Sequence, residues 1–310
     1  MRIVLIGQQD FGKAVLEAAL ARGDTVAGVF CAPQAPGARP DPLHAAATER
    51  GLAVLQLPSL RDGRAIDAMR ALDADIGIMA YVVQFAPQDF VQVPRLGTVQ
   101  YHPSLLPRHR GPSSINWPII LGETQTGLTI FRPTEGLDEG PIILQKRVPI
   151  GPDDTLGSVY FNHLFPLGVA ALLEAADLVH AGHAQETTQD ETLASYEGWC
   201  RAAEARISWH APADQIYNLI RGCNPAPGAW TTLAGRKLTI FDARLHPSRT
   251  FGAVQGKPGQ CIAIGNDSML ISAHGGQIEI FKVRGEDGRK LPAPEYCSES
   301  GLQTGFIVGT

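Results

Sequence analysis

Cysteine is scarce in this chain. There are five cysteines among 310 residues, widely scattered, and none forms a Cys-x-x-Cys pair. A disulfide framework needs an even set of cysteines, and a thiolate zinc site needs paired spacing. The sequence indicates neither, so we expect buried or idle thiols and no metal site.

Long hydrophobic runs are missing as well. The longest apolar stretches, such as residues 168–173, fall far short of the roughly 20 residues that a membrane span needs. A strand-like run begins directly after Arg2, without the charged and apolar regions of a secretory signal. We therefore expect a cytoplasmic protein with no membrane partner.

Positive charge is not in excess. The chain has 26 Lys and Arg against 31 Asp and Glu, which gives a formal net charge of -5 at pH 7. A general electrostatic grip on nucleic acid needs clustered positive charge. The composition argues against such a grip, although a local basic patch remains compatible with it.

Apolar material is plentiful, at 44% of 310 residues, and suffices for the cores of two domains. In the first part of the chain, short apolar runs alternate with segments of helical periodicity. Strands are expected at residues 2–7, 25–30, 76–80 and 97–101, helices at 11–22 and 63–72, a strand pair at 127–131 and 142–148, and a long helix at 155–181. This alternation predicts an α/β, Rossmann-like domain with a parallel sheet, over residues 1–203.

The pattern changes beyond residue 204. One helix is expected at residues 213–221, followed by short strands between Gly, Pro and Asn turns. These strands are expected at residues 237–241, 260–264, 269–273 and 277–283. The sequence therefore predicts a small β-barrel-like domain over residues 204–310.

Three short segments could carry chemistry. Residues 7–12 follow the first strand, but Gln9 stands where a dinucleotide fingerprint needs a glycine, so an ordinary strand-to-helix turn is favoured. His102 lies at the carboxyl end of a core strand, where open α/β sheets build their sites. Asp138 lies in a turn between Gly136 and Gly140. Taken singly, such a histidine is more often structural and such an aspartate is usually part of a turn.

Together these segments resemble the formyltransferases that take a one-carbon unit from 10-formyltetrahydrofolate. The pattern is most similar to the amino-terminal hydrolase domain of 10-formyltetrahydrofolate dehydrogenase, and methionyl-tRNA formyltransferase is related. The matching segments are residues 6–8, 11–12, 28–30, 101–111, 115–117 and 136–138, and in the second domain 207–209, 220–222 and 227–230. The resemblance covers nearly the whole chain.

The resemblance implies a catalytic set and a donor site. His102 would hydrogen-bond the oxyanion of a tetrahedral intermediate, and Asp138 would orient His102 and accept a proton from the attacking amine or water. Gln100 occupies the position where the transferases carry Asn. The residues implied to contact 10-formyltetrahydrofolate are Tyr81, Gln84, Phe85, Ala86, Glu135, Gly136 and Leu137, and no metal is implied.

The acceptor is the open question at this stage. Gln100 departs from the transferase pattern and matches the hydrolase relatives in lacking Asn, which favours water or a small amine as acceptor. Methionyl-tRNA formyltransferase is the first alternative, disfavoured by Gln100 and by a short loop at residues 32–42 with only one Arg and one Asp. A folate-binding module without turnover is the second alternative, disfavoured by the presence of both His102 and Asp138.

Other polar and aromatic residues have less specific interpretations. Arg108 and Arg110 could meet an anionic acceptor or the glutamate tail of folate, or could be solvated surface residues. Arg132 and Pro133 stand where the family favours apolar or aromatic side chains. The four tryptophans are expected to be core or interface anchors, because stacking on nucleic acid would require basic neighbours.

Overall fold

The computed structural model describes residues 1–35, 37–248, 250 and 254–309. The chain divides into two compact units, each assembled from separate stretches of sequence. The first contains residues 1–111, 127–148 and 161–196, and the second contains residues 112–126, 149–160 and 197–310. Because segments 112–126 and 149–160 belong to the second unit, contacts do not divide the chain at one point, and the boundary at 203/204 stays a prediction.

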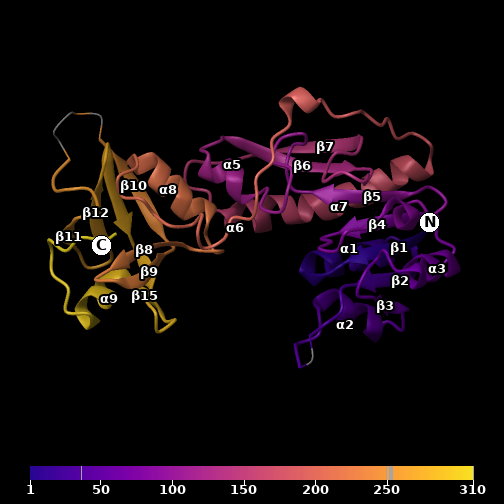
Figure 1. Cartoon of the computed structure of the whole chain (residues 1–310), viewed down its shortest axis with the longest axis horizontal. Helices are drawn as coiled ribbons and strands as arrows, with labels where there is room; N and C mark the ends of the chain where they lie inside the picture. Colours follow the sequence, from indigo (N-terminus) through magenta and orange to yellow (C-terminus); the bar gives the residue numbers. More distant parts are fainter. Residues whose placement is uncertain (36, 249, 251–253, 310) are drawn as a thin grey trace. The chain divides into compact units, whose positions relative to one another are not determined.

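The first unit is built on a seven-stranded sheet with the order β3-β2-β1-β4-β5-β6-β7 (Figure 1). Its strands are β1 (Arg2–Gly7), β2 (Thr25–Cys31), β3 (Val54–Gln56), β4 (Ile76–Ala80), β5 (Thr98–His102), β6 (Gln125–Phe131) and β7 (Ile142–Pro149). The first five pair in parallel, whereas β6 runs antiparallel to β5. The predicted Rossmann-like parallel sheet is confirmed.

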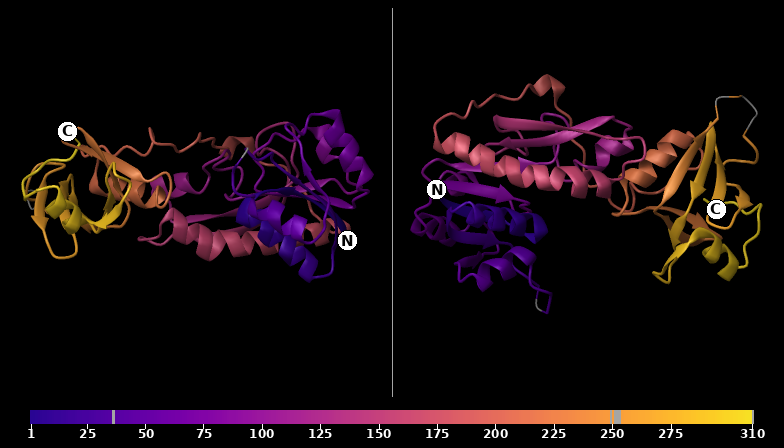
Figure 2. Two further views of the ribbon diagram at one scale, coloured as in Figure 1. Left: turned by 90° about the horizontal axis from the view of Figure 1, so that it is seen from below. Right: turned by 180° about the vertical axis from the view of Figure 1, so that it is seen from behind.

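Helices cover both faces of this sheet (Figure 2). They are α1 (Gln9–Ala21), α2 (Pro42–Glu49), α3 (Gly63–Ala71), α4 (Gln88–Val91) and α7 (Phe165–His180), which is preceded by α6 (Leu156–Val159) and a π-helical turn (Tyr160–Leu164). Val4 and Ile6 of β1 pack with residues of α3 and α4 in one core cluster. On the opposite face, Phe11 of α1 stacks on Tyr101 and meets Phe165 edge-on. Side chains of β1 and β5 are therefore buried from both sides, which explains their nearly continuous apolar runs.

One helical stretch, Leu156–His180, is long and apolar enough to cross a membrane by length and composition alone. The sequence prediction missed this, because it considered uninterrupted apolar runs only. The α7 part of the stretch packs on α1 and on strands β4 and β5. A core helix passes the same test, so the stretch is only weak evidence for a membrane span.

The second unit holds two four-stranded sheets of antiparallel strands around a common core. One sheet contains β10 (Ala243–Pro247), β13 (Gly276–Ile280), β12 (Met269–Ala273) and β11 (Cys261–Ile264), and the other contains β15 (Lys290–Pro292), β14 (Lys282–Arg284), β9 (Arg236–Ile240) and β8 (Ala229–Leu233). Its helices include α5 (Asn116–Ile120), α8 (Ala213–Gly222) and α9 (Ala293–Glu299), and α6 also falls within its residues 149–160. The predicted β-rich second domain is confirmed.

Several details differ from the sequence predictions. The expected strand 277–283 is two strands, because the chain leaves one sheet after Ile280 and enters the other at Lys282. Trp209 is buried as expected, but Trp199 is 55% exposed and is not a core residue. All five cysteines are free and buried, as predicted, and the Sγ atoms of Cys200 and Cys223 lie 3.7 Å apart.

Candidate functional site

The candidate site lies at the carboxyl edge of the parallel strands. Gly7 at the end of β1 pairs with Ala80 at the end of β4, and Met79 pairs with Gln100 of β5. His102 is the last residue of β5. Open α/β sheets bind ligands at this edge, because the strands end there together and the following loops are free to vary.

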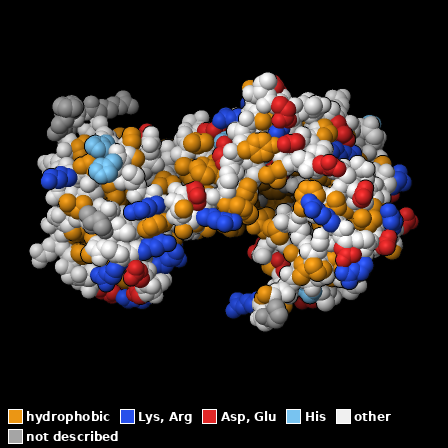
Figure 3. All heavy atoms as spheres, viewed as in Figure 1, with side chains coloured by type: hydrophobic (Ala, Val, Ile, Leu, Met, Phe, Trp, Pro, Cys, Tyr) orange, Lys and Arg blue, Asp and Glu red, His pale blue; other side chains and the backbone are white. Residues whose placement is uncertain are grey.

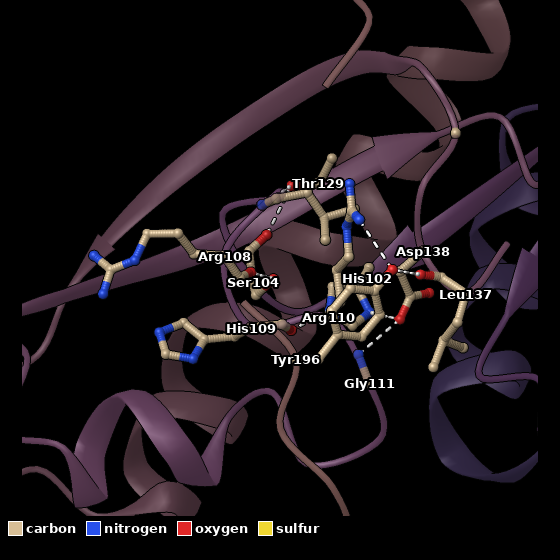
Figure 4. A network of polar contacts seen from close by, with 12 residues as sticks. His102, Ser104, Arg108, His109, Arg110, Gly111, Thr129, Leu137, Asp138 and Tyr196 are labelled. Atoms are coloured by element: carbon tan, nitrogen blue, oxygen red, sulfur yellow. Dashed lines mark hydrogen bonds and ion pairs between the residues drawn. The ribbon is translucent and has the colours of Figure 1, made fainter. Parts of the chain in front are cut away.

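His102 is buried, and each ring nitrogen faces one oxygen atom (Figure 4). Nε2 lies 2.8 Å from the carbonyl oxygen of His109, and Nδ1 lies 3.5 Å from Oδ2 of Asp138. Since a carbonyl oxygen can only accept, Nε2 must carry a hydrogen. Nδ1 is the ring nitrogen that faces Asp138, and its distance to Asp138 exceeds that of a normal hydrogen bond.

Asp138 is buried and is held in an uncommon backbone conformation. Its φ of 58° lies in the left-handed region, and its Oδ2 accepts the backbone N–H of Gly111 at 2.9 Å. The loop around it is tightly folded, since a Cβ at Gly140 would lie 1.6 Å from the carbonyl oxygen of Arg132. Gly140 is thus required by a close backbone approach.

Gln100 lies two residues before His102 on the same strand. Side chains alternate along a strand, so Gln100 and His102 point to the same face of the sheet. Gln100 is half-buried, whereas Val99 and Tyr101 on the other face are buried. Gln100 and His102 therefore share one face of β5, and the catalytic role of Gln100 stays a prediction.

The residues implied to contact the donor lie on two loops. Tyr81, Phe85 and Leu137 are about half exposed, at 51%, 49% and 57%. Such large apolar side chains at a polar site are suited to contact a flat ligand. The loops are neighbours, because Nε2 of Gln88 donates to the carbonyl oxygen of Pro133 at 3.1 Å.

The other residues implied to contact 10-formyltetrahydrofolate differ in burial and in their contacts. Gln84 is engaged with the backbone, since its Nε2 lies 2.9 Å from the carbonyl oxygen of Leu57, and Ala86 is buried in the α3 and α4 core. Glu135 is exposed and Gly136 half-buried. The guanidinium of Arg61 lies 4.4 Å from the ring centroid of Phe85. Arg61 was not singled out from the sequence, where nothing connects it to residue 85.

The arginines divide sharply. Arg108 is exposed and points away from Asp138 (Figure 4), whereas Arg110 is among the most deeply buried side chains. The sequence interpretation of Arg110 as a solvated surface residue is wrong, and its contact with an anionic ligand stays a prediction. Arg132 is also structural, because Nε binds Glu186 and Nη1 donates to two backbone carbonyls at the base of β5.

Arg110 is surrounded by residues that sequence reasoning missed: Gln189, Glu191 and Tyr196. The hydrogen bond from Arg110 lowers the pKa of the Glu191 carboxyl. Desolvation is the main cause that raises the pKa of Tyr196, and its hydrogen bond with Glu139 adds to it.

No group of three or more His, Cys, Asp or Glu that could hold a metal ion occurs among the described residues.

Comparisons with known proteins agree with this geometry. Residues 1–175 match the formyl transferase family model, and residues 200–301 match the model of the formyl transferase C-terminal domain. The chain belongs to the formyl transferase family. It is therefore an enzyme of that family, with the amino-terminal and carboxy-terminal domains in the order that the structure shows.

This formyl transferase is similar to two kinds of curated proteins. It is 37% identical over 309 residues to the mitochondrial 10-formyltetrahydrofolate dehydrogenase of Mus musculus, with 96% of this chain and 33% of the relative covered. It is 32% identical over 314 residues to the methionyl-tRNA formyltransferase of Geobacter metallireducens, with 100% of this chain and 99% of that protein covered. The chain thus spans about a third of the dehydrogenases it matches.

Solved structures share its fold. HypX from Aquifex aeolicus in complex with tetrahydrofolic acid has a TM-score of 0.70 at 20% identity and covers 98% of this chain and 48% of its own. A Helicobacter canadensis N-formyltransferase, in complex with folinic acid and dTDP-3-aminofucose, has a TM-score of 0.68 at 18% identity and covers 90% of this chain and 98% of its own. At these identities the likeness supports the fold alone.

Proposed function

We propose that this enzyme takes the formyl group of 10-formyltetrahydrofolate and transfers it to water or to a small amine, releasing tetrahydrofolate. The carrying observation is the buried His102–Asp138 pair at the carboxyl edge of the sheet. The similarity to 10-formyltetrahydrofolate dehydrogenases supports 10-formyltetrahydrofolate as the formyl donor. The half-exposed Tyr81, Phe85 and Leu137 offer apolar surface for its flat ring system.

The proposed reaction begins with attack on the formyl carbon. The lone pair of the amine or water forms a bond to carbon, and the π pair of the carbonyl moves to its oxygen. Protonated at Nδ1, His102 donates a hydrogen bond to this oxyanion, which is strongest in the transition state. At 3.5 Å from Asp138, Nδ1 is not engaged in a short hydrogen bond and is available to the oxyanion. Apo geometries of this kind commonly tighten when substrate binds.

Asp138 handles the proton in this proposal. Its Oδ2 accepts a hydrogen bond from the backbone N–H of Gly111, and this bond holds the carboxylate beside His102. It accepts the proton lost by the attacking nucleophile. Collapse of the intermediate then re-forms the carbonyl from the oxyanion pair and breaks the bond between carbon and N10 of the folate. N10 takes the proton held by Asp138 to give tetrahydrofolate.

A second candidate, methionyl-tRNA formyltransferase, is favoured by two observations. The chain covers almost all of the Geobacter enzyme. In addition, Trp230, Thr239, Arg284 and Lys290 lie in one cross-strand row of the second unit's sheet. Lys and Arg side chains gather over β8, β9 and β15 (Figure 3). Trp230 does have basic neighbours, Arg206 and Lys237, contrary to the sequence prediction.

Other features keep this candidate in second place. Cations occupy the aromatic faces near this row. Arg206 and Lys237 lie over Trp230. Nζ of Lys290 lies 3.7 Å from the ring centroid of Phe241, which is itself buried. Base stacking needs exposed ring faces. Gln100 and the net charge of -5 also favour a small acceptor.

The deciding experiment follows tetrahydrofolate release from 10-formyltetrahydrofolate by the purified protein. The assay is run alone, and then with amino sugars, hydroxylated ornithine or charged initiator tRNA. Release in buffer, or faster release with a small amine, supports the proposal. Release that requires charged tRNA supports the second candidate. Donor binding without release under any condition supports a folate-binding module.

A further inference from the structure

Arg110 is a buried guanidinium with every donor satisfied. Nε and Nη2 donate to Oε1 of Gln189 at 3.2 and 2.8 Å. Nη1 and Nη2 donate to the carboxylate of Glu191 at 2.8 and 2.6 Å, and Nη1 also donates to the hydroxyl of Tyr196 at 2.9 Å. Arginine has five N–H donors, and all five are used here. The guanidinium therefore fixes Gln189 from one side.

Gln189 connects Arg110 to the Asp138 loop. It is 5% exposed, and its Nε2 donates to the carbonyl oxygens of Asp138 and Gly140, at 2.8 Å each. Both amide hydrogens are thus used on the loop, while its carbonyl oxygen is held by Arg110. A planar amide anchored at both ends holds two loop carbonyls at fixed positions.

The Asp138 backbone is a conformation that needs support. A non-glycine residue in the left-handed region is strained and persists where its surroundings determine it. The carboxylate direction depends on this backbone, and the same carboxylate faces His102 and Gly111. An unsupported loop would be free to relax and would carry Oδ2 away from the imidazole.

We propose that Gln189, anchored by Arg110, is a positioning residue that holds Asp138 in line with His102. The proposal rests on the proposed function, in which Asp138 acts on the proton of the nucleophile. It assigns a role in turnover to two side chains that touch no substrate. The pair works through hydrogen bonds to the backbone of the loop rather than through charge at the reacting atoms.

The test is Gln189→Glu, which keeps length, shape and an acceptor for Arg110 but removes both N–H donors to the loop. We expect kcat for tetrahydrofolate release to fall about ten- to a hundredfold, because small misplacements of a catalytic group have effects of this size. KM for 10-formyltetrahydrofolate should stay within about twofold, since the defect lies in the transition state. Near-native kcat would overturn the proposal.

Gln56→Glu is the matched control. Gln56 is a half-buried glutamine in the first unit, and its Nε2 likewise donates to a backbone carbonyl, that of Ala32, at 3.0 Å. We expect this variant to retain kcat. Thermal unfolding is measured for both variants, and if Gln189→Glu does not fold, the neutral Gln189→Met variant takes its place with the same required outcome.

A double-mutant cycle with Asp138→Asn separates positioning from a general structural role. If Gln189 acts through Asp138, Gln189→Glu should change the residual turnover of Asp138→Asn by less than about twofold, because interacting residues are non-additive. A loss that persists in full would overturn the proposal. If Asp138→Asn itself has near-native turnover, the proposed function fails and this inference fails with it. If Asp138→Asn is inactive while Gln189→Glu is not, only the positioning role is refuted.

Discussion

His102 and Asp138 meet through Nδ1 and Oδ2 at 3.5 Å, while the opposite nitrogen of the same ring is tied to the backbone at His109. The imidazole is thus held by its non-reacting side. Its reacting side faces a carboxylate that is itself held by Gly111. This arrangement fixes the ring without committing Nδ1 to a short hydrogen bond, which suits a group that must interact with a transient oxyanion.

Removing either member of this pair should abolish most of the turnover. We expect His102→Ala and Asp138→Asn each to lower formyl release at least about a hundredfold, the range of general acid–base assistance. Donor affinity and fold should be retained, because each change removes a transition-state interaction more than a ground-state one. Single-turnover release and equilibrium folate binding check this, and near-native release by either variant would refute the catalytic assignment.

Much of this site could be predicted from sequence because its parts are local. His102 ends an apolar strand and Asp138 lies in a glycine-flanked turn, and both features show in a few consecutive residues. The burial of Arg110 could not be predicted, since its partners Gln189 and Glu191 lie 79 and 81 residues further along the chain. An arginine next to Arg108 and His109 looks like a surface residue until those partners are known.

In the fold, too, local features could be predicted from the sequence and long-range packing could not. Strands β1, β4 and β5 were predicted because both faces are covered and their sequences are continuously apolar. The change of sheet between β13 and β14 was missed, because Phe281 does not interrupt the apolar pattern. The interleaving of segments 112–126 and 149–160 with the second unit depends on long-range packing, which short-range periodicity does not report.

Arg110 should be important for stability. Arg110→Met leaves the buried carbonyl oxygen of Gln189 without its donors, and an unsatisfied buried acceptor costs about 1–3 kcal/mol. We expect the free energy of unfolding to fall by that amount or more in urea titrations. Arg70→Met is the control, because its side chain is 64% exposed and such surface pairs contribute at most about 1 kcal/mol. Equal losses in both variants would contradict the prediction.

Acid should weaken the same cluster. Arg110 holds the pKa of Glu191 below its usual value of 4.5, so the folded protein binds this proton less readily than the unfolded chain. The stabilisation is complete above pH 4.5 and is lost as the pH falls through the lowered value. We expect Glu191→Gln to be less stable at neutral pH and to lose less stability on acidification. Parallel stability curves for the variant and the parent would contradict this.

Salt dependence distinguishes the two acceptor classes. Each phosphate neutralised by a protein releases counterions, so tRNA-dependent turnover falls steeply with salt. We expect weak salt dependence and no detectable binding of initiator tRNA. Tight, salt-sensitive binding would promote the second candidate. In that case Lys237→Gln and Arg284→Gln, on the basic face of the second unit, should weaken it.

Gln100 provides the sharpest test of acceptor choice. An Asn at this position would donate its amide N–H to the oxyanion, and losing one such donor costs about 2.7 to 4 kcal/mol. The extra methylene of Gln displaces the amide by about 1.5 Å, a single C–C bond. Gln100 lies on the same face of β5 as His102. In one case, a shift of the loop restores the hydrogen bond from the amide to the oxyanion. In the other case, His102 stabilises the oxyanion with less help, and the enzyme is slow, so that water competes well with amines.

We expect the second case, in which His102 stabilises the oxyanion with less help, and it predicts different results for two variants. Gln100→Asn should raise the ratio of amine transfer to hydrolysis, given the right acceptor, because it restores a donor at the transferase distance. Gln100→Ala should change hydrolysis by less than about tenfold, because an amide that is out of reach contributes little to the oxyanion. The rate of hydrolysis and the ratio of transfer to hydrolysis both come from following tetrahydrofolate release with and without the amine. If Gln100→Ala abolishes hydrolysis and transfer together, Gln100 already donates to the oxyanion, and the enzyme is better described as a true transferase.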